Sequence, residues 1–153
     1  MDGLFNGVET ELADAVQSRE QAVDHRIAAD AATVTGDPAK LHDALRNLLE
    51  NASNYAPPRS RIVMASERKD GKIVLTVEDE GPGIPQAELS RVFERFYRVD
   101  KARSRGGQDP GGTGLGLAIV RHLIELHGGR VTAANRPAGG ARFTIELPQP
   151  SDN

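Results

Sequence analysis

Residues 72–84 read KIVLTVEDEGPGI, a run that passes from a strand-like pattern directly into a turn. Asp70-Gly71 ahead of it is a two-residue hairpin signal, and residues 61–68 before that signal are also strand-like. We therefore predict paired strands at 61–68 and 72–79. Asp79 at a strand end can accept a hydrogen bond from an exocyclic amine, and the following glycines let a ligand approach the backbone. A plain turn is the alternative reading of this motif taken alone.

Helices are predicted on both sides of this hairpin. Asp37-Pro38 is an oxygen cap followed by a ring of preset φ, and Pro57-Pro58 ends the helix that follows. Helical spacing also indicates an amphipathic helix over roughly residues 4–22 and another ended by Gly128-Gly129. The apolar faces are assigned to Phe5, Val8, Leu12, Ala15 and Val16; to Leu41, Leu45, Leu48, Leu49 and Ala52; and to Leu115, Ile119, Leu123 and Leu126.

The remaining elements are short. Residues 25–28 and 33–35 are possible strands, and Pro85 opens a short helix that carries Leu89, Val92 and Phe93. Residues 130–135 and 141–147 form a closing hairpin. The mixture predicts an α/β two-layer sandwich with a mixed, mostly antiparallel sheet covered on one face by helices. We expect one domain over 1–153: helix and first strands at 1–35, a motif-bearing core at 36–148 and a tail at 149–153.

Composition excludes several function classes. The chain has 153 residues, 38% hydrophobic and 27% charged, with a net charge of −3 and no cysteine. The charge gives no reason to expect nucleic acid or an anionic membrane as partner. The absence of cysteine excludes disulfides, zinc-thiolate sites and cysteine catalysis. No apolar run approaches the ~20 residues of a membrane helix.

Amides line one side of the predicted 38–56 helix. Asn47, Glu50, Asn51 and Asn54 are spaced by three or four residues and lie away from the leucine face. Asparagine is a poor helix former, so the stripe is either a solvated face or a functional one. An amide oxygen is a suitable ligand for Mg²⁺ bound to nucleotide phosphates, which needs only one or two protein oxygens.

A glycine-rich turn opens the last predicted helix. Residues 111–117 read GGTGLGL, and such a turn presents free N–H groups at a helix N-terminus, which suits phosphate. The spacing fits neither a Walker loop nor a dinucleotide fingerprint. Residues 99–113 are rich in glycine and charge and contain Lys101, Arg103 and Arg105. A long loop of this kind is either a solvated segment or a lid over nucleotide.

The order of four motifs then becomes informative. NLLENA (47–52), DEGPGI (79–84), FERFYR (93–98) and GTGLGLA (112–118) resemble the asparagine, first glycine, phenylalanine and second glycine boxes of sensor histidine kinase catalytic domains. DPAKLH (37–42) and HGG (127–129) also resemble that family. The resemblance spans roughly residues 36–148. It implies the Bergerat ATP fold, which type II topoisomerases, Hsp90 chaperones and MutL repair proteins share.

The resemblance also implies roles for individual residues. Asn51 corresponds to the magnesium ligand with Asn47 in support, and Asp79 to the carboxylate that reads adenine. Arg98 corresponds to a phosphate contact on the lid side, and Phe93 and Phe96 to anchors at the lid base. The implied catalytic residues are Asn47, Asn51 and Arg98, with ATP and Mg²⁺ as cofactors. The implied nucleotide-binding residues are Asn51, Asp79, Gly81, Gly83, Ile84, Phe96, Gly112, Thr113, Gly114, Leu115, Gly116 and Leu117.

Two positions separate the alternatives. ATP-hydrolysing relatives carry a general-base glutamate where this chain has Asn47, which disfavours an ATP-hydrolysing clamp. Asn54 stands where the family often has a lysine or arginine that contacts phosphate, so phosphate contact from this helix is in question. An anti-sigma-type protein-serine kinase is disfavoured by the complete phenylalanine box and long lid, and a nucleotide-binding regulatory module without transfer activity stays open. Phosphoryl transfer depends mainly on alignment and charge neutralisation, so this domain needs no covalent residue.

The phosphoacceptor is expected elsewhere. The sequence around His25, His42, His122 and His127 does not match the family acceptor, and His127 lies near a helix end, where a partial positive charge would help. The implied partners are the dimerisation domain of the same kinase, which carries the acceptor and is expected just upstream of this fragment, and a response regulator downstream. We expect a monomer, in the cytoplasmic part of a membrane-anchored sensor, with no direct membrane contact by this domain.

Overall fold

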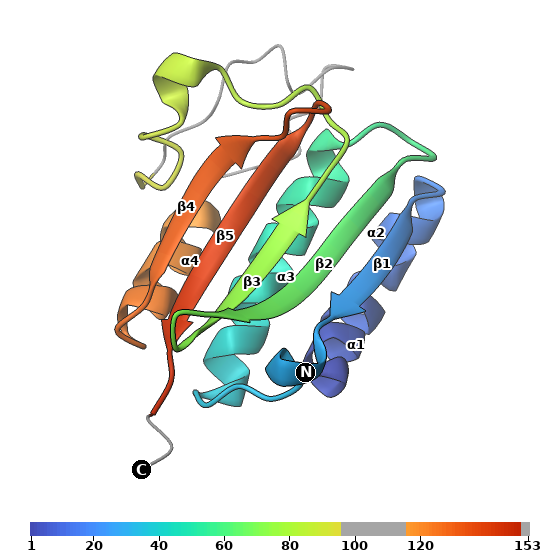
Figure 1. Cartoon of the computed structure of the whole chain (residues 1–153). Coiled ribbons are helices and arrows are strands. Elements are labelled where there is room, and N and C mark those ends of the chain that lie inside the picture. Colours follow the sequence, from blue (N-terminus) through green and yellow to red (C-terminus); the bar gives the residue numbers. More distant parts are fainter. Residues whose placement is uncertain (96–115, 151–153) are drawn as a thin grey trace.

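The computed structural model describes residues 1–95 and 116–150. Within them five strands form one mixed sheet in the order β1-β2-β3-β5-β4: β1 (Ala22–Ile27), β2 (Arg61–Lys69), β3 (Lys72–Glu78), β5 (Ala141–Pro148) and β4 (Arg130–Asn135). The β1–β2 pair is parallel, and the other three pairs are antiparallel. The long helices lie together on one face of the sheet (Figure 1). The predicted α/β sandwich with a mostly antiparallel sheet is confirmed.

Helix α3 (Pro38–Tyr55) forms as its sequence predicts. The Asp37 side chain accepts the Lys40 N–H at 3.1 Å, and Pro38 occupies the first turn, where no N–H partner is needed. The expected apolar residues are all buried against the sheet: Leu41, Leu45, Leu48, Leu49 and Ala52. At the other end, the buried Gln21 side chain donates to the Ser53 and Ala56 carbonyls, which satisfies acceptors that a helix end leaves open.

The first predicted helix is shorter than expected and is divided. It consists of α1 (Asp2–Glu11) and α2 (Ala13–Ser18), with a break at Leu12. It cannot run to residue 22, because Glu20 adopts a φ of 55° as the chain reverses into β1. Arg19 and Gln21 in this reversal both donate to carbonyls at the end of α3. Tertiary contacts therefore override the helical spacing of the sequence.

Two short strand predictions need correction. The expected strand at 25–28 begins earlier and is β1, which pairs with β2 over its whole length. Residues 33–35 form no strand, and the Thr35 N–H is instead satisfied by the Gln149 side chain at 2.8 Å. A 3-10 turn, η1 (Ala29–Ala31), lies between these segments. The β2–β3 hairpin turns at Asp70-Gly71 as predicted, with φ of 52° and 76°.

The apolar face of α4 (Gly116–Glu125) differs in part from the prediction, although Leu123 packs against the core as expected. Val120 and Ile124 are fully buried, whereas Ile119 and Leu126 are 43% and 58% exposed. The helix is apolar on more than one side, so spacing alone could not choose between two stripes. The short helix expected after Pro85 is only a 3-10 turn, η2 (Gln86–Glu88), followed by further turns.

His127 joins the ends of two helices. Its Nδ1 lies 2.9 Å from the Leu123 carbonyl oxygen, and its Nε2 lies 3.0 Å from the Asp37 backbone nitrogen. A carbonyl can only accept and a backbone N–H can only donate, so these two contacts require the tautomer with its proton on Nδ1. They do not use the positive charge expected at this helix end. In this arrangement the ring connects the start of α3 to the end of α4.

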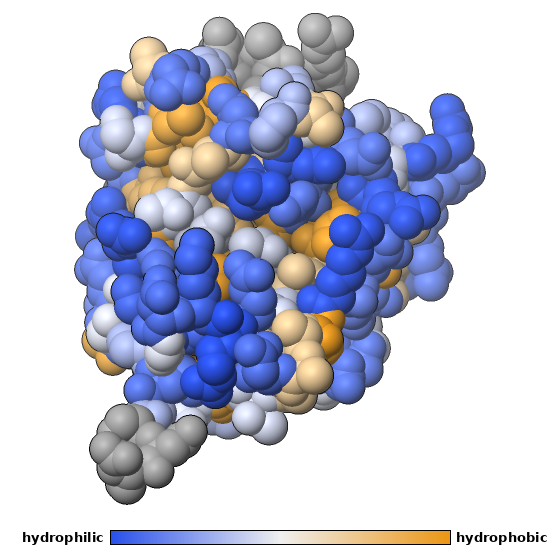
Figure 2. Space-filling model, in the orientation of Figure 1, coloured by the Kyte–Doolittle hydropathy of each residue, from blue (hydrophilic) through white to orange (hydrophobic). Residues whose placement is uncertain are grey.

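The core lies between the helices and the sheet, and it includes Phe5 and Val8 of α1 as well as residues of α3, α4 and four strands. The opposite sheet face is left open by the helices. Figure 2 views this face and shows mainly hydrophilic residues with small hydrophobic areas between them. No helix within the described residues has the length and hydropathy that crossing a lipid bilayer requires.

Candidate functional site

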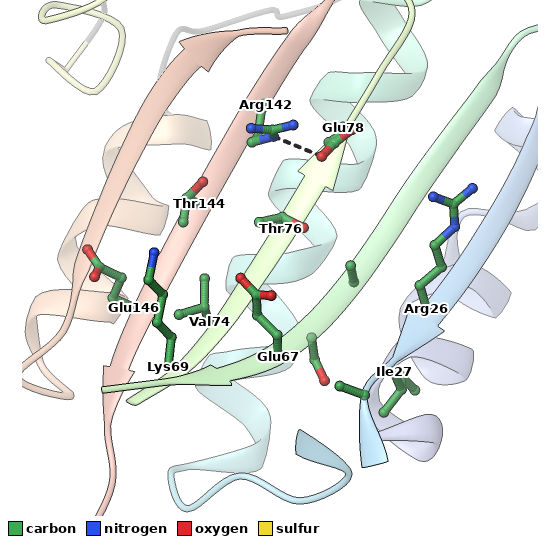
Figure 3. A pocket seen from close by; sticks show the side chains of 13 residues that line it. Arg26, Ile27, Glu67, Lys69, Val74, Thr76, Glu78, Arg142, Thr144 and Glu146 are labelled. Atoms are coloured by element: carbon green, nitrogen blue, oxygen red, sulfur yellow. Dashed lines mark hydrogen bonds and ion pairs between the residues drawn. The ribbon is translucent and has the colours of Figure 1, made fainter. Parts of the chain in front are cut away.

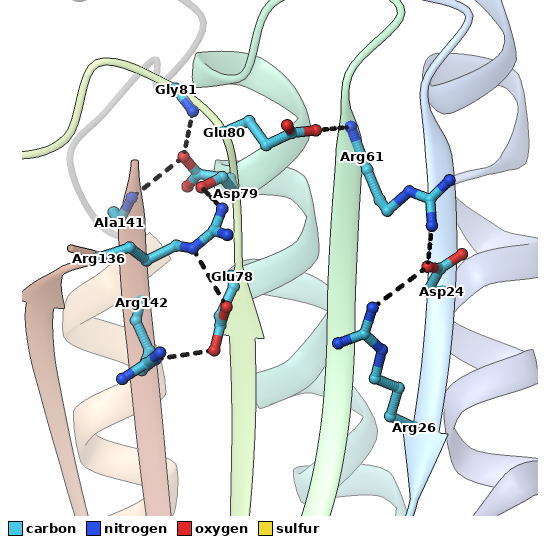
Figure 4. Close-up of polar contacts among 10 residues, drawn as sticks. All are labelled: Asp24, Arg26, Arg61, Glu78, Asp79, Glu80, Gly81, Arg136, Ala141 and Arg142. Carbon is cyan, nitrogen blue, oxygen red and sulfur yellow. Dashed lines mark hydrogen bonds and ion pairs between the residues drawn. The ribbon is translucent and has the colours of Figure 1, made fainter. Parts of the chain in front are cut away.

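Asp79 lies directly after β3, on the face of the sheet that the helices cover. Ile73, Leu75 and Val77 alternate toward the core, and Asp79 continues that alternation with only 1% exposure. Its Oδ1 accepts the N–H groups of Gly81 at 2.8 Å and Ala141 at 3.3 Å (Figure 4). Burying a carboxylate costs free energy, which hydrogen bonds offset only in part. Asp79 is therefore a strong candidate for a group that binds a ligand.

The turn at residues 79–84, called the 79–84 turn below, lies against the C-terminal end of α3. A Cβ at Gly81 would come within 2.9 Å of the Tyr55 carbonyl oxygen, so the two backbones are in close contact. Gly83 has a φ of 80°, a conformation that L side chains rarely adopt. Ile84 is buried, with 3% exposure. The glycines of the motif are therefore required by close approach and by backbone conformation.

The amides of α3 face the start of α4. A Cβ at Gly116 would lie 3.2 Å from Asn47 Oδ1, and Asn47 Nδ2 donates to the Asp43 carbonyl at 2.8 Å. One turn along, Asn51 Nδ2 is buried and has no hydrogen-bond partner within the described residues. Buried polar groups are usually paired, so the unpaired Asn51 Nδ2 donor points to an acceptor on a ligand. Asn54 and Leu117 are half-buried.

The structure thus brings together part of the predicted site. The 79–84 turn contacts the last turn of α3, and Asn47 of the same helix contacts Gly116. Phe93 is buried and packs edge-to-face on Phe143, with ring centroids 6.0 Å apart, as its apolar character predicts. The predictions for Phe96, Arg98, Gly112, Thr113, Gly114 and Leu115, and for the loop at 99–113, lie outside the described residues.

Glu50, the acidic member of the amide stripe, is engaged elsewhere. Its carboxylate lies 3.0 Å from Arg46, which also approaches Glu11 of α1 at 3.7 Å. His42 pairs with the same Glu11 carboxylate, and His25 pairs with Glu9 at 2.8 Å. These contacts attach α1 to α3 and β1. They give Glu50, His25 and His42 structural partners on the side of the molecule occupied by α1.

A separate hollow of about 830 Å³ lies on the open face of the sheet (Figure 3). Its lining carries acidic and basic side chains in equal number, from Glu67, Glu78 and Glu146 and from Arg26, Lys69 and Arg142. None of the predicted site residues lines it. Because the Asp79 side chain lies on the opposite face of the sheet, we place the candidate site at the motifs rather than in this hollow.

Sequence reasoning missed the residues that support the 79–84 turn from the β4–β5 connection. Asn135 hydrogen-bonds both backbone groups of Ile84 at 2.7 Å, and Arg136 donates to the Asp79 carbonyl at 2.9 Å. A Cβ at Gly140 would lie 1.9 Å from that carbonyl. The only available signal was Pro137 with Gly139-Gly140, which marks a hairpin turn and nothing more.

A helix-covered mixed sheet, a buried aspartate before a glycine turn and two asparagines on the neighbouring helix α3 are together typical of one class of ATP-binding α/β sandwich. Residues 36–151 match the family described as histidine kinase-, DNA gyrase B-, and HSP90-like ATPase, and the chain belongs to this family. ATP binding is the shared property in that description.

Within this family, the chain is similar in sequence to sensor histidine kinases. The chain is 40% identical over 151 residues to the sensor-like histidine kinase SenX3 of Mycolicibacterium smegmatis, covering 95% of this chain and 38% of that protein. It is 40% identical over 123 residues to the signal transduction histidine-protein kinase BaeS of Escherichia coli, covering 80% and 26%. The chain therefore spans well under half the length of these relatives.

Solved structures of histidine kinases have the same fold as this chain. A mycobacterial sensor histidine kinase, MprB, matches with a TM-score of 0.78 at 32% identity, covering 93% of each chain. The catalytic domain of the histidine kinase ThkA matches with a TM-score of 0.82 at 26% identity, covering 97% of this chain and 92% of that one. Both similarities extend over nearly the whole of the present chain.

Proposed function

We propose that this chain is the ATP-binding catalytic domain of a sensor histidine kinase, formed as one domain by residues 1–153. The observation that carries the proposal is the buried Asp79 at the end of β3, fixed by two backbone N–H groups and facing the amide-bearing helix α3. The named kinases among its relatives support the same function. In this role the chain binds ATP and presents its γ-phosphoryl group to a histidine.

The 79–84 turn binds the base in this proposal. The Asp79 carboxylate accepts a hydrogen bond from the exocyclic amine of adenine, which guanine lacks at that position. Gly81 and Gly83 allow the ring to approach the backbone, and Ile84 supplies an apolar surface. Gly116 and Leu117 continue the site at the start of α4. Phe96, Arg98, Gly112, Thr113, Gly114 and Leu115 stay predictions from the family motifs.

Mg²⁺ is the second component of the proposal. Asn51 would hold it through its amide oxygen, supported by Asn47, because an amide oxygen is a hard ligand. The buried Asn51 Nδ2, which has no hydrogen-bond partner within the described residues, is a donor and would suit a phosphate oxygen beside the ion. Within the described residues no three His, Asp or Glu side chains gather as a metal site, so the ion would depend on amide and phosphate oxygens. When bound, it neutralises charge that develops on the phosphates.

The transfer itself needs an acceptor from another domain. A nitrogen of the acceptor imidazole forms a bond to the γ-phosphorus while the bond from that phosphorus to the β–γ bridging oxygen breaks. ADP leaves with the electron pair, and the ring loses its N–H proton. Asn47 is no general base, so attack by water is poorly activated and ATP is kept for the histidine.

The partners follow from this reaction. The acceptor lies on a dimerisation domain of the same kinase, and the phosphoryl group passes on to a response regulator. A complex of ThkA with its response regulator protein TrrA is known among proteins of the same fold. The proposal includes a monomeric isolated domain in the cytoplasmic part of a membrane-anchored sensor.

Calorimetric titration with ATP, with Mg²⁺ and with a chelator, tests the binding site. We expect saturable binding that is tighter with Mg²⁺, and an Asn51→Ala variant that loses more affinity for Mg-ATP than for metal-free ATP. Equal losses in both conditions would show that Asn51 is not a metal ligand. Addition of the dimerisation domain of a related kinase and γ-labelled ATP then tests transfer. Binding without any labelled histidine would favour a regulatory module.

A further inference from the structure

The connection between β4 and β5, residues 135–141, holds the 79–84 turn from outside the base site. We call it the 135–141 turn. It provides a side chain for each end of its neighbour, Asn135 for Ile84 and Arg136 for Asp79. Ala141 adds a backbone pair, since Asp79 N–H donates to its carbonyl at 3.0 Å. Segments that are distant in sequence are thereby fixed against each other.

Asn135 forms a reciprocal pair with one residue. Its Oδ1 accepts the Ile84 N–H at 2.7 Å, and its Nδ2 donates to the Ile84 carbonyl at 2.7 Å. The orientation of the amide is unambiguous, because a backbone N–H only donates and a carbonyl only accepts. An aspartate at this position would place a carboxylate oxygen against the carbonyl. A side chain with one donor and one acceptor is therefore required here.

Arg136 is itself held in place. Its Nη1 donates to the Asp79 carbonyl at 2.9 Å, and its Nε lies 3.2 Å from Glu78 Oε2 (Figure 4). Arg142 binds the other Glu78 oxygen at 2.8 Å. The Arg136 and Glu78 side chains are only 22% and 21% exposed, so solvent screens this pair less than an open surface pair. The network approaches Asp79 from the open face of the sheet.

The two contacts act on the parts of the turn that the base would touch. Asp79 is held at its amide by Ala141, at its carbonyl by Arg136 and at its carboxylate by two N–H groups. Ile84 is held at both backbone groups by Asn135. Neither Asn135 nor Arg136 needs to contact a ligand to do this. A binding segment fixed before the ligand arrives loses less entropy on binding.

We propose that Asn135 and Arg136 are positioning residues that set the 79–84 turn in the shape that reads adenine. The proposal rests on the proposed function and extends it to a part of the chain outside the four motifs. It predicts that the 135–141 turn controls selectivity for the base, whereas contacts to the phosphates are made by other elements.

The test compares Asn135→Ala, the isosteric Asn135→Asp and Arg136→Gln with Thr132→Ala, an exposed control on the same strand β4. ADP and GDP affinities are measured at a temperature where each variant is fully folded. We expect Asn135→Asp to bind ADP about tenfold more weakly, equivalent to about 1.4 kcal/mol, and the preference for ADP over GDP to fall with it. Arg136→Gln should also lower both the ADP affinity and the preference for ADP over GDP. Thr132→Ala should change neither quantity.

Amide hydrogen exchange of the nucleotide-free protein provides a readout that does not depend on nucleotide. We expect faster exchange at Gly81, Gly83 and Ile84 in the Asn135 variants than in Thr132→Ala. A folded Asn135→Asp protein with unchanged ADP affinity and unchanged selectivity would overturn the proposal. If the wild-type protein bound no ADP, the proposed function itself would fail. Unchanged exchange at Ile84 would then overturn the positioning role as well, and faster exchange would support it.

Discussion

At the scale of single residues, the proposed function gives the Asp79 side chain two purposes. Oδ1 holds the turn by accepting two N–H groups, which needs an oxygen but no charge. Reading adenine needs an acceptor toward the ligand. Because an asparagine can keep the first interaction while presenting a donor to the second, the two purposes can be separated by a single isosteric substitution.

The Asp79→Asn variant should therefore fold normally and lose most of its affinity for ATP. Hydrogen bonds to a charged group contribute about 1.5–3 kcal/mol, so we expect at least a tenfold loss, measured by calorimetry beside a thermal melt. GTP is the control ligand, because it lacks the exocyclic amine that Asp79 would accept from. Equal ATP and GTP affinities in the wild-type protein would contradict the assignment.

At this scale the motif residues could be predicted from the sequence, but the residues that hold them in place could not. Asp79, Gly81 and Gly83 could be predicted because a strand pattern passes directly into closely spaced glycines, which is typical of a tight turn or a ligand-binding turn. Asn135 gives no such signal, since one asparagine at a strand end is typical of any turn. Its importance depends on Ile84, a partner 51 positions away, and only the fold brings the two together.

At the scale of elements, α3 depends on the groups at its two ends. A hydrogen bond from the Lys40 backbone N–H, with the Lys40 side chain beside it, lowers the pKa of Asp37 below its usual value. A carboxylate whose pKa is lowered by folding adds stability at pH values above its unfolded pKa. That contribution is lost as the pH falls through the folded pKa.

Asp37→Ala should lower the unfolding temperature at pH 7, where the carboxylate is charged, and should have a smaller effect well below pH ~3.9, the ordinary aspartate value. Asp37→Asn is the matched control, because asparagine also caps helices but carries no charge. Its stability should resemble that of the wild-type protein and should lack this part of the acid dependence. An Asp37→Ala effect that grew toward low pH would contradict this account.

His127 provides a second element-scale prediction. Replacing it by phenylalanine keeps the ring and removes both hydrogen bonds, to Leu123 and to Asp37. Two ordinary hydrogen bonds contribute about 1–3 kcal/mol together, and denaturant unfolding should show a loss of that size. His122→Phe, at an exposed position of α4, is the control. Equal effects at both positions would mean that the bridge between α3 and α4 contributes nothing.

Elements with one apolar face were predicted well, and ambiguous ones were not. Residues 37–55 carry a cap, a proline and a single leucine stripe, and α3 follows this pattern closely. Residues 116–126 are apolar on two stripes, and the packing of α4 on α3 selected Val120 and Ile124. The helix predicted over 4–22 ended early because its last residues are used to contact α3, which no local pattern encodes.

At the scale of the whole molecule, the sandwich is held by one continuous core. Phe143 of β5 is 1% exposed and packs against Phe93, which precedes the second glycine motif. The fold class was predictable because strand and helix patterns are mixed along the chain and hairpin signals are frequent. The parallel β1–β2 pair was not, because pairing partners that are far apart leave no trace in local periodicity.

Phe143→Ala should cost about 3–5 kcal/mol in unfolding free energy, the usual range for a fully buried phenylalanine. Because the core is continuous, we expect a single cooperative transition by both circular dichroism and fluorescence of a bound dye. Thr144→Ala, the next residue on the open face, should cost less than about 1 kcal/mol. Two separate transitions in Phe143→Ala would show that the sheet and the helices unfold independently.

The strand order has a consequence for how the chain reaches this structure. The central strand β3 has β2 as a local partner, but its other partner is β5, whose residue Pro148 pairs with Lys72. Contacts this distant in sequence close slowly, because a long loop must be ordered first. During synthesis one edge of β3 and the backbone around Asp79 therefore stay unpaired until residues 141–148 have emerged. A ribosome-stalled chain ending before residue 141 should be a ready client for chaperones.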